Sequence, residues 1–133
     1  MDNPITLGMI KADIATARSA LANIADGKLN DYGKGLRGIA AYHAQQALEK
    51  LIKYKIYDTE KYVDNRQIYT HDIDNLCALA ISLGVTIPRE IQLNASMYSE
   101  WEASGRYDLH FVARKDSINK AIRLAEEFLQ TIE

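Results

Sequence analysis

The sequence predicts an all-α protein, a single up-and-down helical bundle of four to five helices that occupies residues 1–133. Several segments repeat apolar residues at intervals of three and four, which is the spacing of one face of an α-helix. No segment alternates apolar and polar residues for long enough to form a strand. The chain has 133 residues, of which 47% are hydrophobic, and this is enough for one domain with one core.

The first predicted helix begins at Pro4, with Asn3 as its cap, and ends at the Asp26-Gly27 pair. Its apolar stripe is expected to face the core and consists of Ile10, Ile14, Ala17, Leu21 and Ile24. A glycine-containing turn is expected over 28–35. The second helix then runs from about Leu36 to Tyr57, because this segment is dense in residues that favour helices.

The remaining helices are predicted from caps and apolar spacing. The third begins near Thr70, whose hydroxyl can cap it, and carries His71 in its first turn. The fourth runs from Pro88 to about Ala103, and the fifth is capped by Asp116 or Ser117. Their expected buried residues are Ile73, Leu76, Leu79, Ala80, Leu83, Ile91, Ala95, Tyr98, Trp101, Ile118, Ala121, Ile122, Ala125, Phe128, Leu129 and Ile132.

The charge balance limits the classes of function. Lysine and arginine number 16 and aspartate and glutamate 18, so the net charge is -2. A protein that wraps duplex DNA is usually basic, so any contact with phosphate has to come from a local patch. The single cysteine, Cys77, excludes an internal disulfide and suits a reducing compartment. With no membrane-length apolar run and no signal-peptide layout, a cytoplasmic protein is expected.

Metal and cofactor sites are not indicated by the sequence. The three histidines, at positions 43, 71 and 110, do not have the close spacing of a zinc site. Cys77 lies in an apolar run, where a small core residue is expected rather than a nucleophile. No glycine-rich segment matches a phosphate-binding loop or a dinucleotide fingerprint. We therefore expect no metal and no cofactor.

Arg106 and His110 form one candidate catalytic pair. They are four positions apart, so they would share a face if this stretch were helical. A guanidinium can hold a phosphate through two hydrogen bonds, and an imidazole can move a proton near neutral pH. Tyr107 adds a ring on which a base can stack. The alternative is a plain link, in which Arg106 pairs with a helix end and Tyr107 packs beneath it.

His43 and His71 are the other candidate binding residues. Arg37 precedes His43 by six residues, so the two side chains diverge by about 120° around a helix. His43 falls beside the apolar stripe, and a partly buried, hydrogen-bonded role is the alternative to ligand binding. His71 can face a phosphate, or it can serve only as a hydrogen-bonded residue at the start of its helix.

Three segments resemble the HEPN domain family. They are AAYHAQQALEKLIKYKIY at 40–57, THDIDNLCAL at 70–79 and SGRYD at 104–108. The resemblance implies a four- or five-helix bundle that often forms a homodimer. Many members are ribonucleases with an arginine and a histidine separated by four to six residues, duplicated across the dimer. This chain has only three residues between Arg106 and His110.

The resemblance also implies a partner. Minimal HEPN proteins often lie beside a small nucleotidyltransferase in two-gene modules of the toxin–antitoxin type. We therefore expect a protein that binds a nucleotide or single-stranded RNA through His43, His71, Arg106 and Tyr107. One alternative is a metal-independent endoribonuclease that acts as a dimer through Arg106 and His110. The other is a helical interaction module, whose interface would be marked by four exposed tyrosines, Tyr54, Tyr57, Tyr62 and Tyr69.

Overall fold

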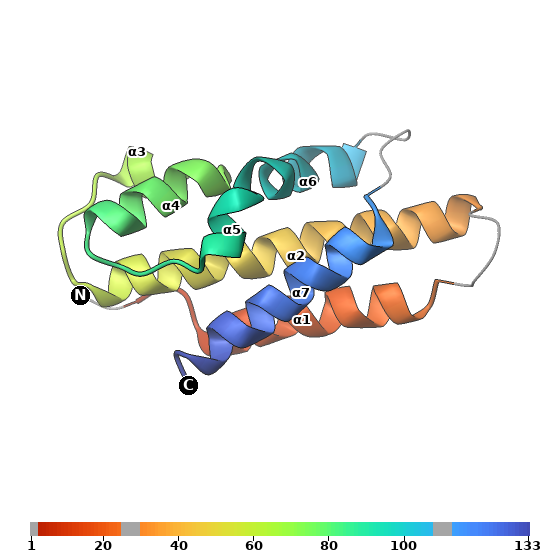
Figure 1. Ribbon diagram of the computed structural model, residues 1–133, viewed down its shortest axis with the longest axis horizontal. Helices are drawn as coiled ribbons and strands as arrows, with labels where there is room; N and C mark the ends of the chain where they lie inside the picture. The colour runs from red at the N-terminus through yellow and green to blue at the C-terminus, as the bar shows by residue number, and fades with distance from the viewer. Residues whose placement is uncertain (1–2, 25–29, 108–112) are drawn as a thin grey trace.

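The long central helix organises the molecule. The computed structural model describes residues 3–24, 30–107 and 113–133, and for residues 103 and 105–107 it describes the backbone alone. Seven helices are present in these ranges: α1 (Leu7–Ala22), α2 (Asp31–Asp58), α3 (Asn65–Ile68), α4 (Ile73–Ser82), α5 (Arg89–Leu93), α6 (Ala95–Tyr107) and α7 (Lys115–Gln130). Helix α2 packs against α1, α4, α6 and α7 (Figure 1). The all-α class is confirmed, whereas the described ranges contain more helices than the four or five that were predicted.

Helix α1 begins later than predicted. Thr6 is its cap, because the Thr6 hydroxyl accepts a hydrogen bond of 3.2 Å from the backbone N–H of Met9. Asn3 has another role: its side-chain amide donates to the backbone carbonyl of Tyr54 at 3.0 Å, which attaches the preceding segment to α2. The helix ends at Ala22, before the predicted Asp26-Gly27 stop, which lies outside the described residues.

Helix α2 begins before the predicted turn ends. The side chain of Asn30 accepts a hydrogen bond of 2.8 Å from the backbone N–H of Gly33, so the cap lies within the segment expected to be a turn. The prediction was wrong here because two glycines weaken a helix without preventing it. Alanines occupy the side of α2 that meets its neighbours, and Ala40, Ala44 and Ala47 are buried.

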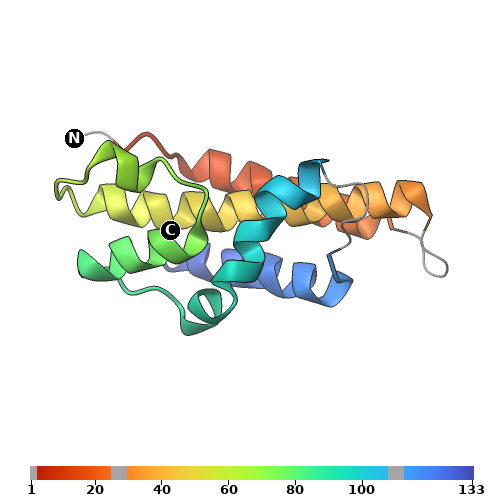
Figure 2. The ribbon, with the colours of Figure 1, turned by 90° about the horizontal axis from the view of Figure 1, so that it is seen from above.

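The segment predicted as a fourth helix contains two. Asn94 ends α5, and its side-chain amide donates to the backbone carbonyl of Glu90 at 2.8 Å. The backbone carbonyl of Asn94 then accepts the first bond of α6, from the N–H of Tyr98 at 3.1 Å. Helix α6 continues to Tyr107, beyond the stop predicted near Ala103, and crosses α2 obliquely (Figure 2).

The caps of the third and fifth predicted helices also differ. Asp72, rather than Thr70, caps α4 by accepting the backbone N–H of Asn75 at 3.2 Å. Arg114 is the capping residue of α7 and makes no capping bond with its side chain. Asp116 lies inside the first turn and binds the guanidinium of Arg114 at 3.0 Å, so the predicted Asp116 or Ser117 cap is wrong.

The predicted apolar stripes form one continuous core. Every residue expected to be buried is buried except Leu79, Leu83 and Ile132, which are partly buried against the core. The rings of Tyr98 and Trp101 meet edge to face with centroids 5.1 Å apart. No helix in the described part of the chain is both long and apolar enough to cross a bilayer.

Candidate functional site

One side of α2 carries a concentrated set of polar side chains. Within the described ranges, the buried polar or charged residues are Asp13, Gln45, Gln46 and Glu49. We define the polar face of α2 by His43, Gln46, Glu49, Lys50 and Lys53. At about 100° per residue, these five positions fall within a sector about 120° wide. Burial of carboxylates at this face requires positively charged or hydrogen-bonding partners.

The first cluster joins α1 to α2 through Asp13. The carboxylate oxygen Oδ1 of Asp13 lies 2.8 Å from Nδ1 of His43, and Oδ2 pairs with the ammonium of Lys50. Asp13 lies within the apolar stripe of α1, between Ile10 and Ile14, so packing of that stripe places the carboxylate against α2. His43 and Lys50 are seven positions apart, which is about two helical turns, and both therefore reach the same carboxylate.

The second cluster joins α2 to the segment before α4. The carboxylate oxygen Oε1 of Glu49 lies 2.8 Å from Nδ1 of His71, and Oε2 lies 3.2 Å from Nζ of Lys53. The side-chain amide of Gln45 donates to Glu49 Oε1 at 3.2 Å and to the backbone carbonyl of His71 at 3.3 Å. Gln46 donates to the side-chain oxygen of Gln45 at 2.7 Å. This network satisfies the buried carboxylate from two elements.

Each carboxylate orients an imidazole. An ionised carboxylate accepts hydrogen bonds only, so Nδ1 of each histidine is the donor and Nε2 remains on the other edge of the ring. The side chain of His71 is 61% exposed and that of His43 is 30% exposed, whereas their carboxylate partners are 6% and 10% exposed. Two oriented imidazoles therefore reach solvent from buried anchors, each beside a lysine.

One tyrosine contacts the imidazole of His43, and another lies close to His71 in the sequence. The ring of Tyr42 meets the ring of His43 edge to face, with centroids 5.1 Å apart. Tyr69 precedes His71 by two residues and is 73% exposed. Burial raises the pKa of Tyr57, and the nearby phenol of Tyr69 raises this pKa further, so these two groups are close in space. The site thus combines cations, imidazoles and aromatic rings.

Comparison with known proteins identifies the fold. A sequence profile of the HEPN domain matches residues 17–133. The chain belongs to the HEPN domain family. A search of curated proteins and a search of solved structures gave no significant match. The matched span of the HEPN domain includes His43, Glu49 and His71 but begins after Asp13, so one of the two carboxylates precedes it.

Two predicted site residues of this HEPN domain belong to the polar clusters. His43 is partly buried and hydrogen-bonded. This environment is the one expected under the alternative to ligand binding. His71 lies two residues before α4 rather than in its first turn. This part of the prediction was wrong because Asp72 caps the helix, which leaves His71 to turn toward Glu49.

The predicted Arg106–His110 pair is not tested by the described side chains. Arg106 and Tyr107 belong to the last turn of α6, where only the backbone is described, and His110 lies outside the described residues. Their proximity therefore stays a prediction. Arg37, which was expected to diverge from His43, has a buried Nε with no hydrogen-bond partner among the residues that the structure describes.

The four tyrosines that were predicted to mark an interface differ in their exposure to solvent. Tyr62 and Tyr69 are exposed, but Tyr54 and Tyr57 are partly buried and pack against the core. The expectation that all four are exposed was therefore wrong. The reason is that Tyr54 and Tyr57 lie on α2, where neighbouring segments cover them.

Sequence reasoning missed the residues that complete the two clusters around the histidines in this HEPN domain. They are Asp13, Gln45, Gln46, Glu49, Lys50 and Lys53. One indication was available for Asp13, because it lies beside Ile14 and three positions after Ile10, on a helix face that is otherwise apolar. A charged residue at such a position is buried with a partner or marks a site.

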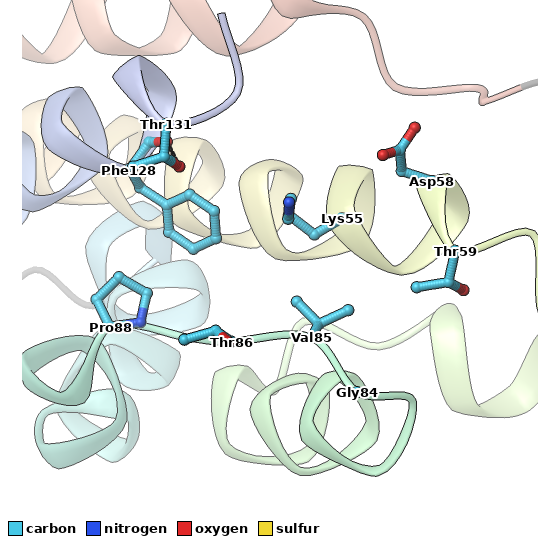
Figure 3. Close-up of a pocket in the computed structure, with 9 residues that line it drawn as sticks. All are labelled: Lys55, Asp58, Thr59, Gly84, Val85, Thr86, Pro88, Phe128 and Thr131. Atoms are coloured by element: carbon cyan, nitrogen blue, oxygen red, sulfur yellow. Dashed lines mark hydrogen bonds between the residues drawn. The ribbon is translucent and has the colours of Figure 1, made fainter.

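Two other features do not contribute to this site. Burial raises the pKa of the Cys77 thiol to about 11, with a smaller contribution from the charge of Asp74, so the thiol is a poor nucleophile. A cavity of about 540 Å³ lies between the end of α2, residues 84–88 and the end of α7 (Figure 3). Its cation, Lys55, is two positions from Lys53, so the two ammonium groups lie on opposite sides of α2.

Metal ligation is not supported by the clusters. In the ranges that the structure covers, no three His, Cys, Asp or Glu side chains are grouped closely enough to hold an ion. Each cluster instead pairs one carboxylate with one imidazole and one ammonium. What the site offers chemically is two imidazoles and two ammonium groups that buried carboxylates hold in place.

Proposed function

We propose that this HEPN domain binds a nucleotide or single-stranded RNA through the polar face of α2, with His43 and His71 as phosphate contacts. One observation carries the proposal: two imidazoles that reach solvent are each held through Nδ1 by a buried carboxylate that also holds a lysine. Membership of the HEPN family is consistent with a role related to nucleotides or RNA. Arg106 and Tyr107 are further contacts that the family resemblance implies.

The chemistry of the clusters suits an anion. The carboxylate and the lysine of each cluster cancel in charge, so protonation of the imidazole makes the cluster positive. A doubly protonated imidazole donates from both nitrogens, which allows Nδ1 to keep its carboxylate while Nε2 donates to a phosphate oxygen. Charge-assisted hydrogen bonds of this kind are stronger than neutral ones. A local site can thus bind phosphate on a chain whose net charge is -2.

A titration tests the proposal. Fluorescence anisotropy would follow a labelled uridine decamer at low salt with the wild-type protein and with the His43→Gln, His71→Gln and Lys53→Gln variants. We expect binding by the wild type and a loss of about tenfold or more for each variant, because each removes a charge-assisted contact of about 1.5–3 kcal/mol. Lys120→Gln is the matched control, since it removes one lysine from α7, outside the clusters.

Two results would refute the proposal. An absence of binding by the wild type, or an equal loss in the Lys120→Gln control, would refute a role for the polar face. Circular dichroism of each variant would separate loss of the contact from loss of the fold.

We also infer two partners from the family resemblance. The protein is proposed to form a homodimer and to pair with a small nucleotidyltransferase in a toxin–antitoxin-type module. Light scattering tests the first, and co-purification with a nucleotidyltransferase encoded beside it tests the second. A monomer at micromolar concentration, or no co-purification, would reject the respective pairing.

A second candidate function is metal-independent RNA cleavage. It is favoured by His71, whose Nδ1 is held by Glu49 while the side chain is 61% exposed. A carboxylate that orients an imidazole in this way is a common arrangement for general acid–base catalysis. The family resemblance proposes Arg106 and His110 as the catalytic pair instead. Cleavage in EDTA that is lost in His71→Ala but kept in His110→Ala would favour the polar face, and the reverse would favour the family pair.

A further inference from the structure

The two clusters divide the carboxylate oxygens in the same way. In the first cluster, Oδ1 of Asp13 binds the imidazole of His43, and Oδ2 pairs with the ammonium of Lys50. In the second cluster, Oε1 of Glu49 binds the imidazole of His71, and Oε2 pairs with the ammonium of Lys53. The chain therefore builds one arrangement twice, with the carboxylate from α1 in one case and from α2 in the other.

The spacing between the clusters is set by α2. Lys50 and Lys53 differ by three positions, and His43 and Glu49 differ by six. At 1.5 Å per residue, the two clusters are offset by about 5–9 Å along the helix axis. This offset is of the order of the distance between successive phosphates of an unstacked single strand.

Aromatic residues accompany both clusters. Tyr42 contacts the ring of His43, and exposed Tyr69 lies two residues from His71, near Tyr57. Proteins that bind single strands combine positive charge along the backbone with rings on which bases stack. A duplex hides its base faces and could not use these rings.

We infer that the polar face of α2 takes at least two successive nucleotides of one RNA single strand, with one phosphate at the His43–Lys50 pair and the next at the His71–Lys53 pair. The inference rests on the proposed function and narrows it, because a mononucleotide would fill only one of two equivalent clusters. Gln46 lies between the clusters on the same face, where its amide is held by Gln45.

Stoichiometry tests the inference directly. Isothermal titration calorimetry would compare uridine 5′-monophosphate with the 5′-phosphorylated uridine dinucleotide, which carries two phosphates. We expect two monophosphates per chain but one dinucleotide per chain, bound at least tenfold more tightly. We also expect a slope of log affinity against log salt of about −1.4 for the dinucleotide, since each neutralised phosphate of a single strand contributes about −0.7.

Matched variants assign each phosphate to a cluster. Lys50→Gln and Lys53→Gln should each reduce the monophosphate stoichiometry to one per chain and halve the salt slope of the dinucleotide. Lys50→Arg and Lys53→Arg keep the charge and should retain both values, which controls for folding. Lys120→Gln should match the wild type.

The results that would reject this inference differ from those that would reject the proposed function. One monophosphate per chain, with no gain in affinity for the dinucleotide, would overturn the two-phosphate site and leave nucleotide binding intact. Dinucleotide binding abolished by one lysine variant and unaffected by the other would also overturn it. No binding of either ligand would reject both proposals.

Discussion

Oε1 of Glu49 lies 2.8 Å from Nδ1 of His71, although the two residues are 22 positions apart and belong to different elements. The carboxylate is nearly inaccessible, with its side chain 6% exposed, while the imidazole is 61% exposed. The pair thus joins the core of the HEPN domain to its surface. Two buried or half-buried donors, Gln45 and Lys53, share the same carboxylate.

Removal of the two partners of this pair should have unequal effects on stability. We expect Glu49→Ala to lower the free energy of unfolding by about 3–5 kcal/mol, because it leaves Lys53 unpaired with its side chain 12% exposed. His71→Ala should cost less than about 1 kcal/mol, because most of the imidazole is in water. Urea denaturation measures both. A loss for His71→Ala as large as that for Glu49→Ala would contradict the assignment of Glu49 as the central acceptor.

Asp13 should act on ligand binding through His43. In Asp13→Asn the acceptor for Nδ1 loses its charge, so His43 is less firmly oriented and the affinity for single-stranded RNA should fall about tenfold, as expected for loss of a charge-assisted contact. Combined with His43→Gln, the substitution should add little, because both act on one contact. Anisotropy titration of the four proteins measures this coupling. Fully additive losses would show that Asp13 acts by another route.

Replacement of two glycines by alanine should change the stability of the fold in opposite directions. Gly84 has a φ of +86°, in the left-handed region, so Gly84→Ala should destabilise the fold by about 1–2 kcal/mol. Gly35 lies inside α2, and a Cβ there would meet no atom of the described residues within 4 Å. Gly35→Ala should therefore stabilise by about 0.5–1 kcal/mol. Thermal unfolding followed by circular dichroism tests the pair, and equal signs would contradict the backbone described at one of them.

Cys77 should resist alkylation in the folded protein. Burial raises the pKa of its thiol to about 11, so at a pH of about 8 the reactive thiolate is scarce and shielded. The folded-state pKa lies above that of an unfolded thiol. The raised pKa of the Cys77 thiol therefore contributes fully to the stability of the fold below the pKa of the unfolded thiol. This contribution is lost as pH rises toward 11. Iodoacetamide labelling with and without urea tests this, and equal rates would contradict burial of the thiol.

The apolar spacing in the sequence was sufficient for the helices and most of the core. The stripe from Ile10 to Ile24 and the stripe from Ile118 to Leu129 are buried as predicted, because a helix can bury only the residues that recur on one side. The ends of helices were less predictable. Asn3 and Asn30 are both capable of capping, but only Asn30 does so, since capping depends on the backbone conformation around each residue.

The candidate site shows the same division between local and long-range information. His43 and His71 were identified from the sequence, and so was the helical character of the segment that carries Glu49. Asp13 is 30 positions from His43, and Glu49 is 22 positions from His71. Which carboxylate meets which imidazole was decided only by the packing of α1 and the segment before α4 on α2. A buried carboxylate is tolerated only where charged or hydrogen-bonding partners satisfy it, and no local pattern in the sequence specifies which imidazole from another element will be among those partners.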